Sequence, residues 1–408
     1  MRRISLLVGL AVSLLSFAED KEVIPLKDRT SPGREGSIIL PSTDKPIGSA
    51  SNSDQIPVGR GKKSDTESTA TSHGHVNEIK PYVASVETYG SSRINEIILK
   101  ETLGSELNEW IEKGLAGDPS SLDLEVKLAE KVKTKFGFVT AEWSVVQYFE
   151  PEDMAIHITL DVVEPQEAGK RMPFLSNPIK QLRDPSGLIK HWIDYEQIAM
   201  ELIESGQLEP ESETCPAFHC PFGHKHVRLK KYEKIFVEGV KKHAADLNEI
   251  LQYDKRPDFR AASAYLLAYQ KDGKKLVSQM VSHIKDSDST VRNNVLRVLG
   301  DVAEFHPDLI IPIKPVLEAF EFPRVSDRSK ALYVAYLLSL NSQQSRDEIL
   351  KAYVPTLLQI MASHQPDHRD LSHSILRKIS SKDYPANDLQ AWSNWFTRLP
   401  KNPAISRR

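Results

Sequence analysis

A helical repeat in the C-terminal half is the feature that most constrains the fold. Its best-marked unit opens with an apolar stripe at helical spacing, from Leu276 to Ile284. The turn Asp286-Ser287-Asp288 follows, and a second stripe with the same spacing runs from Val291 to Val302. This pattern predicts two helices joined by a short turn. One such pair cannot bury its own apolar face, so it needs stacked neighbours.

The unit recurs from about Leu229 to residue 400. An arginine marks the start of each second helix, at Arg260, Arg292, Arg328 and Arg369, with spacings of 32, 36 and 41 residues. These spacings lie in or near the range of helical-pair repeats. We therefore expect an all-α solenoid over residues 229–400, because stacked pairs bury a continuous core.

The motifs of this unit resemble the HEAT repeat, in which an apolar helix and an Asp-containing turn precede Val-Arg and a second helix ending in Leu-Gly. Val291-Arg292 and Leu299-Gly300 match that pattern directly. From Cys215 onward the chain also resembles bacterial exported HEAT-like proteins of unassigned activity, notably at Asp258-Phe259-Arg260-Ala261-Ala262. The resemblance implies an architecture and adds no function.

The repeated arginines allow two interpretations. They form either a structural ladder that bonds Asp residues of neighbouring turns, which we favour, or a row that binds anions. We expect Val295 and Leu338 in the core. Polar positions on the second helices are candidates for an exposed concave face: Asn293, Asn294, Arg297, Lys330 and Ser372.

Residues 78–165 predict a small α+β domain with the element order β-α-α-β-β. Strand patterns at 82–87, 138–148 and 156–163 flank two helical segments, which end near Gly104 and at Gly137. The order resembles a POTRA domain, a periplasmic module found beside outer-membrane barrels. The matching pieces are Val86–Gly90, Leu103-Gly104, Phe136-Gly137-Phe138 and Ile158–Glu164. The resemblance implies recognition of a peptide or strand at a sheet edge, and no chemistry.

The N-terminus predicts export. Arg2 and Arg3 precede the apolar run Ile4–Phe17, and Ser16-Phe17-Ala18 fits a signal-peptidase site, so residues 1–18 are expected to be a signal peptide. Residues 19–77 contain no aromatic side chain and are expected to be a disordered tail. We expect a periplasmic or secreted protein with no transmembrane span after cleavage. The formal net charge of −3 becomes −5 without Arg2 and Arg3, which argues against nucleic acid as a partner.

Residues 166–228 predict a connector that carries the one constellation with possible chemistry. Pro173, Pro178 and Pro185 favour an extended first half, and 188–206 predicts a helix. A Cys/His cluster follows, which includes both cysteines of the chain: Cys215, His219, Cys220, His224 and His226. Three interpretations are open: a Cys215–Cys220 disulfide, which we favour; a zinc site, since two thiolates and two imidazoles suit Zn²⁺; and free thiols.

The patterns that mark common catalytic sites are missing. We find no Gly-x-Ser-x-Gly, His-Glu-x-x-His or phosphate-binding loop. The sequence therefore favours an exported scaffold for protein–protein interaction, with no catalysis, no cofactor and an unidentified protein partner. The alternative is a metal-binding protein or metal-dependent enzyme centred on the cluster between Cys215 and His226.

Overall fold

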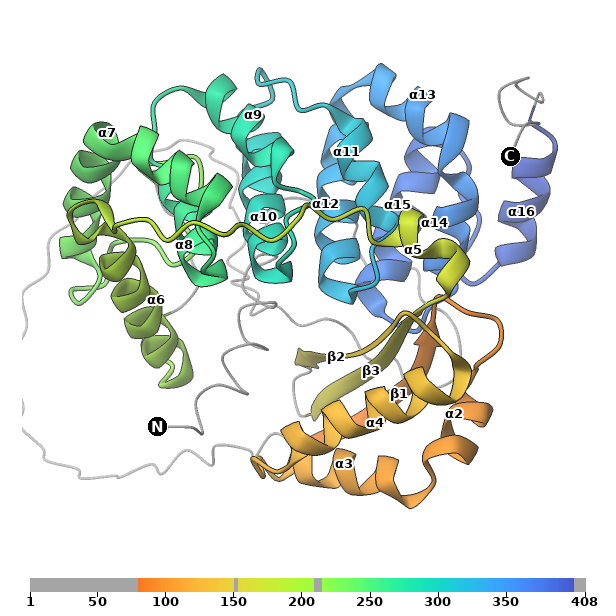
Figure 1. Cartoon of the computed structure of the whole chain (residues 1–408). Helices are drawn as coiled ribbons and strands as arrows, with labels where there is room; N and C mark the ends of the chain where they lie inside the picture. The colour runs from red at the N-terminus through yellow and green to blue at the C-terminus, as the bar shows by residue number, and fades with distance from the viewer. Residues whose placement is uncertain (1–79, 150–152, 209–214, 400–408) are drawn as a thin grey trace, which may run out of the picture.

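The computed structural model describes residues 80–149, 153–208 and 215–399 (Figure 1). The predicted signal peptide and tail lie outside these residues. None of the helices in the described ranges combines the length and the apolar character that a membrane crossing requires.

The first described domain is built on a mixed three-stranded sheet. Its strands are β1 (Lys80–Tyr89), β2 (Thr140–Phe149) and β3 (Asp153–Val163), in the order β1-β3-β2. The central strand β3 runs parallel to β1 and antiparallel to β2. Side chains alternate between the two faces of β3. Even-numbered apolar residues from Ile156 to Val162 enter this domain's core, whereas the odd-numbered face is polar.

Three helices cover the apolar face of the sheet: α2 (Glu96–Leu103), α3 (Ser105–Leu115) and α4 (Ser121–Phe136). The predicted order β-α-α-β-β is wrong by one helix, because α3 was not predicted. Gly104 separates α2 from α3 with φ +57°, a conformation that L side chains rarely adopt. The chain turns there and re-enters a helix at once. Trp110 of α3 packs on Trp143 of β2 with a ring-centroid distance of 4.6 Å.

The rest of the described chain is mainly helical. After α6 (Leu188–Glu204), the helices are α7 (Lys230–Tyr253), α8 (Pro257–Leu267), α9 (Gly273–Ser282), α10 (Ser289–Phe305), α11 (Ile313–Glu318), α12 (Val325–Asn341), α13 (Gln343–Ala352), α14 (Val354–Met361), α15 (Pro366–Ser380) and α16 (Leu389–Thr397). Helices α8, α10, α12 and α15 pack side by side in chain order and form a row (Figure 1). Val295 is fully buried in the core of the row, as predicted, and Leu338 is half-buried against it.

The connector runs back along this row. It contains the 3-10 helix η1 (Pro165–Glu167), α5 (Ala168–Arg171), an extended segment and the 3-10 helix η2 (Pro185–Gly187). The extended segment, as its prolines predict, crosses the front of the row in Figure 1. The Leu175 N–H donates to Lys285 O (2.8 Å), and the Lys180 N–H donates to Tyr253 O (3.2 Å). The connector thereby brings α6 to the opposite end of the row from the α+β domain.

Buried Arg–Asp pairs link successive helices of the row. Arg260 bonds both carboxylate oxygens of Asp286 (2.7 and 3.0 Å). In the same way, Arg292 bonds Asp327 Oδ2 through Nη2 (2.7 Å) and Nε (3.0 Å). The structural ladder is therefore confirmed for these two arginines. The prediction is wrong for Arg369, which is half-exposed and bonds its neighbour Asp370 (3.1 Å).

The next arginine, Arg328, reaches the α+β domain instead. Its Nη1 donates to Asp161 Oδ1 of β3 (2.7 Å), and both side chains are fully buried. Around this pair, the polar face of the sheet lies against α12 and the start of α15. Gln365 Nε2 donates to Thr159 Oγ1 (2.8 Å), and the His364 N–H donates to Glu87 Oε2 (2.8 Å). The two domains therefore share a polar, hydrogen-bonded interface.

The predicted exposed face of the second helices is wrong for most of its candidates. Asn294, Arg297, Lys330 and Ser372 are buried, and Asn293 is half-buried. Neighbouring elements explain part of this burial. The Glu196 carboxyl of α6 interacts with Arg297, and Asp367 of α15 interacts with Lys330. The polar side chains on these helices therefore contact neighbouring elements and do not form an exposed face.

Candidate functional site

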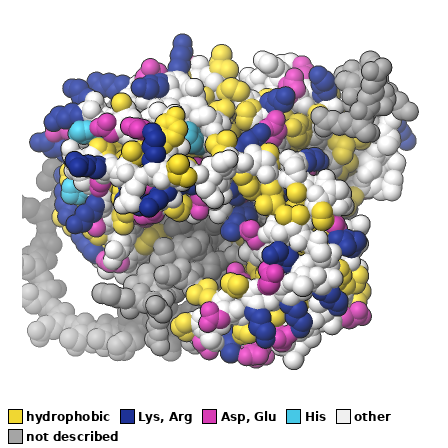
Figure 2. Space-filling model, viewed as in Figure 1, with side chains coloured by type: hydrophobic (Ala, Val, Ile, Leu, Met, Phe, Trp, Pro, Cys, Tyr) yellow, Lys and Arg dark blue, Asp and Glu magenta, His cyan; other side chains and the backbone are white. Residues whose placement is uncertain are grey.

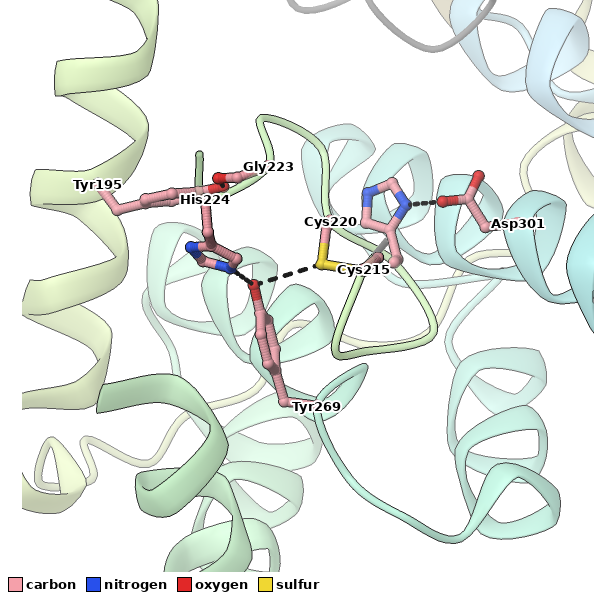
Figure 3. Close-up of a disulfide and its surroundings, with 8 residues drawn as sticks. Tyr195, Cys215, Cys220, Gly223, His224, Tyr269 and Asp301 are labelled. Atoms are coloured by element: carbon pink, nitrogen blue, oxygen red, sulfur yellow. Dashed lines mark hydrogen bonds and ion pairs between the residues drawn. A yellow bond between two sulfur atoms is a disulfide. The ribbon is translucent and has the colours of Figure 1, made fainter. Parts of the chain in front are cut away.

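The Cys/His cluster forms a short loop against α6, α8 and α10 (Figure 3). Cys215 and Cys220 are joined by a disulfide, with their Cα atoms 5.9 Å apart. That separation lies within the ordinary range for a disulfide. Cys215 is exposed and Cys220 is half-buried. The predicted disulfide is therefore present, and it closes a loop that contains His219.

Backbone and aromatic contacts fix this loop to the row. The Phe218 N–H donates to Ala268 O (2.9 Å), and the Phe218 ring packs edge-on to His306 at 4.7 Å between centroids. A Cβ atom at Gly273 would come within 2.9 Å of the Phe218 ring and 2.5 Å of Leu309 Cδ1. Glycine at the start of α9 thus permits the close approach of the loop.

The His219 side chain is buried in the packing between the loop and the row. Its ring stacks on Tyr265 of α8 at 4.9 Å between centroids, with 21° between the planes. Nδ1 lies 2.5 Å from Asp301 Oδ2 of α10. Nε2 is buried and has no hydrogen-bond partner in the described part of the chain. The imidazole is therefore held by one nitrogen and by its face.

The other two histidines have different partners. His224 Nε2 lies 2.7 Å from Tyr269 Oη, and the same hydroxyl lies 3.8 Å from Cys220 Sγ (Figure 3). Burial raises the pKa of Tyr269 well above its ordinary value, so the phenol stays protonated at neutral pH. His226 is half-buried and accepts a hydrogen bond from the Arg228 N–H at 3.3 Å.

The geometry of the cluster bears on the zinc alternative. The two sulfurs are bonded to each other, and the three imidazoles contact α10, the turn after α8 and the loop itself. Across the described ranges, no group of three or more His, Cys, Asp or Glu side chains is placed to hold a metal ion. In this arrangement, the five predicted residues do not together form the ligand set of one zinc ion.

Four polar groups beside His219 were not predicted as part of this site. They are Glu196 of α6, Tyr265 of α8, and Arg297 and Asp301 of α10. The Tyr265 pKa is raised by burial and by the nearby carboxyls of Glu196 and Asp301, and it is lowered by Arg297. Burial raises the pKa of Glu196, and Arg297 opposes that rise. These groups therefore lie close enough to interact. Only the i, i+4 spacing of Arg297 and Asp301 could have linked two of them in the sequence.

The chain matches no family model, no curated protein and no solved structure. The function must be argued from the geometry of the fold and of this site.

Proposed function

We propose that the protein is an exported scaffold for protein–protein interaction, with a POTRA-like domain joined to a HEAT-like solenoid. The regular row of helices supports the solenoid. Its arginines recur at the predicted spacing, and in each of three repeats Nη1 donates to the carbonyl six residues earlier: Arg260 to Asp254, Arg292 to Asp286 and Arg328 to Phe322. A repeated side-chain geometry is what repeating structural units produce.

The edge strand β2 carries the proposal of protein binding. It pairs with β3 without a break over ten residues, from Thr140 to Phe149. At the opposite edge, β1 has an irregularity between Val83 and Ser85. No strand in the described ranges pairs with the other side of β2. A long, regular edge strand can accept a further strand from another chain.

Two other observations support an exported protein and a protein partner. A disulfide between the two cysteines of the chain is typical of an oxidising compartment. On the face seen in Figure 2, acidic and basic side chains are interspersed over the α+β domain. That mixture suits a protein partner better than the phosphates of a nucleic acid.

Photo-crosslinking tests the proposal. p-Benzoylphenylalanine replaces half-buried Ser144 or Gln147 of β2, and the matched control carries it at exposed Glu101 of α2. Irradiation of intact cells should give a discrete protein adduct from the β2 positions and none from the control. Equal adducts from all three positions, or none from β2, would contradict strand-edge binding.

A further inference from the structure

The two cysteines of the disulfide have different surroundings. Cys215 is exposed, whereas Cys220 is half-buried and packs against the core of the helical row. The buried Tyr269 hydroxyl lies 3.8 Å from Cys220 Sγ, and His224 Nε2 lies 2.7 Å from the same hydroxyl (Figure 3). Cys215 is therefore the cysteine that a reagent from solvent reaches, and Cys220 is the one beside a fixed hydrogen-bonding group.

Contacts that do not involve the disulfide hold the chain on both sides of Cys220. Before it, the Phe218 N–H donates to Ala268 O (2.9 Å), and after it, the Tyr195 hydroxyl donates to Gly223 O (2.8 Å). The disulfide joins residues only five apart, so closing this loop removes little entropy from the unfolded chain. Opening the disulfide should therefore leave the loop in place and the two sulfurs near each other.

From this geometry we infer that the disulfide undergoes thiol–disulfide exchange with a dithiol, in which Cys215 Sγ is attacked and Cys220 leaves as a thiolate. A thiolate accepts a stronger hydrogen bond than a disulfide sulfur, so the Tyr269 hydroxyl stabilises the leaving group as its charge forms. Burial raises the pKa of Tyr269 well above its ordinary value, which keeps the hydroxyl protonated and able to donate. Tyr269 is therefore the catalytic residue of the exchange, and His224 is a positioning residue that holds its hydroxyl.

The exchange proceeds in two balanced steps. One thiol of the dithiol loses its proton to solvent and attacks Cys215 Sγ, so that the S–S bond breaks, a mixed disulfide forms and Cys220 leaves as a thiolate. The second thiolate of the dithiol then attacks the dithiol sulfur of the mixed disulfide and releases Cys215. The dithiol loses two electrons and becomes a disulfide, and the protein gains the same two electrons and takes two protons from solvent. This activity goes beyond the proposed scaffold function and does not depend on it.

Two measurements on the mature wild-type protein test this inference. After brief exposure to reduced glutathione, acid quenching and alkylation, peptide mass spectrometry should find glutathione on Cys215 and the alkyl group on Cys220. Dithiothreitol and reduced acetyl-Cys-Gly-Gly-Cys-amide represent a small dithiol and a peptide dithiol. At least one of them should reduce the protein no more slowly than it reduces the cyclic disulfide of acetyl-Cys-Pro-Ala-Phe-His-Cys-amide, which has the same six residues and lacks Tyr269. Glutathione mainly on Cys220, or a protein that reacts more slowly than the peptide with both dithiols, would overturn the inference.

Variants test the residues of the exchange. Tyr269→Phe keeps the ring, removes the hydroxyl and should slow reduction by the faster dithiol about five- to tenfold. The matched control is Tyr232→Phe, at another buried tyrosine that packs on Phe236 as Tyr269 does, and it should react like the wild type.

The position of His224 is tested by rescue. His224→Phe should react as slowly as Tyr269→Phe, whereas His224→Gln still offers a donor to the hydroxyl and should keep at least half of the wild-type rate. A Tyr269→Phe protein that reacts like the wild type would overturn the inference, and a His224→Gln protein as slow as His224→Phe would overturn the positioning role. If Tyr269→Phe does not fold, the cysteine that carries glutathione in the wild type decides the question without a variant.

Discussion

The two Arg–Asp pairs inside the helical row and the pair across the domain boundary have the same chemistry and different origins. Asp286 and Asp327 both belong to the row, to the turn before α10 and to the start of α12. The third acid, Asp161, lies on a β-strand 167 residues away from Arg328. Part of the arginine geometry is kept, since Nη1 still donates to the carbonyl six residues earlier. Arg328 bonds its aspartate through the same Nη1, however, whereas Arg260 and Arg292 use Nε and Nη2. The α+β domain thus supplies the acid that a further repeat would supply.

The comparison distinguishes ion pairs between helices of the row from an ion pair that holds one domain against the other. A pair inside the row stabilises the stacking of neighbouring helices. The Arg328–Asp161 pair stabilises the position of one domain on another. Its surroundings are also more polar, with Glu87 and Thr159 bonded across the boundary. Loss of a pair should therefore have different consequences in the two places.

The largest effect is expected for Arg292→Met. The change leaves Asp327 fully buried without its cation and should lower the free energy of unfolding by about 3–5 kcal/mol. Urea denaturation followed by far-ultraviolet circular dichroism measures the loss. The double variant Arg292→Met/Asp327→Leu removes both charges and should recover most of the stability. A single variant as stable as the wild type would show that the pair contributes little to the row.

A smaller and different effect is expected for Asp161→Asn. The amide oxygen can still accept from Arg328 but carries no charge, so the loss should be about 2–3 kcal/mol. Because the pair joins two domains, we expect calorimetric unfolding to split into two transitions. Hydrogen exchange should rise in β3 and near Arg328 before it rises in α10. Glu142→Gln is the control, because the Glu142–Arg324 pair crosses the same boundary but is partly exposed and should contribute 0 to about 1 kcal/mol. A single transition in Asp161→Asn would contradict the different role of this pair.

The comparison also shows which parts of the structure could be predicted from the sequence. Apolar periodicity predicted the helices around Met280 and Val295, because the apolar residues of each helix recur at helical spacing and face the neighbouring helices. It missed α3, which starts directly after Gly104, where the short gap leaves no loop composition to mark a second helix. It could not place Asp161 against Arg328, because docking between domains has no periodic signal. At the site, the disulfide followed from the two cysteines, whereas the contacts of His219 with Tyr265 and Asp301 depend on tertiary packing.

The contribution of the disulfide to stability can be compared with that of the Arg–Asp pairs. Cys215→Ser/Cys220→Ser should lower the free energy of unfolding by about 2 kcal/mol, because the closed loop is short and its closure removes little entropy from the unfolded chain. Thermal unfolding and hydrogen exchange around Phe218 measure the effect. In the wild type we expect no titratable thiol after denaturation without reductant. Two titratable thiols with about one zinc per chain would contradict the disulfide and favour the metal-binding alternative.

The smallest effect concerns His368, which precedes Arg369 near the start of α15, is fully buried and has its Nε2 3.2 Å from Val325 O. Burial and the nearby Arg328 lower the pKa of His368 from 6.5 to about 3. Between these values the unfolded chain binds the proton more tightly than the folded one, so stability falls as the pH falls below 6.5. This difference should cost about 0.7 kcal/mol between pH 7 and pH 6. His368→Gln can donate to the same carbonyl without titrating, so it should lose that much less than the wild type over the same interval. His157, whose pKa is also lowered, titrates in both proteins and cancels in the comparison. Urea denaturation at the two pH values measures the difference, and equal losses in both proteins would contradict a His368 that stays neutral in the folded protein.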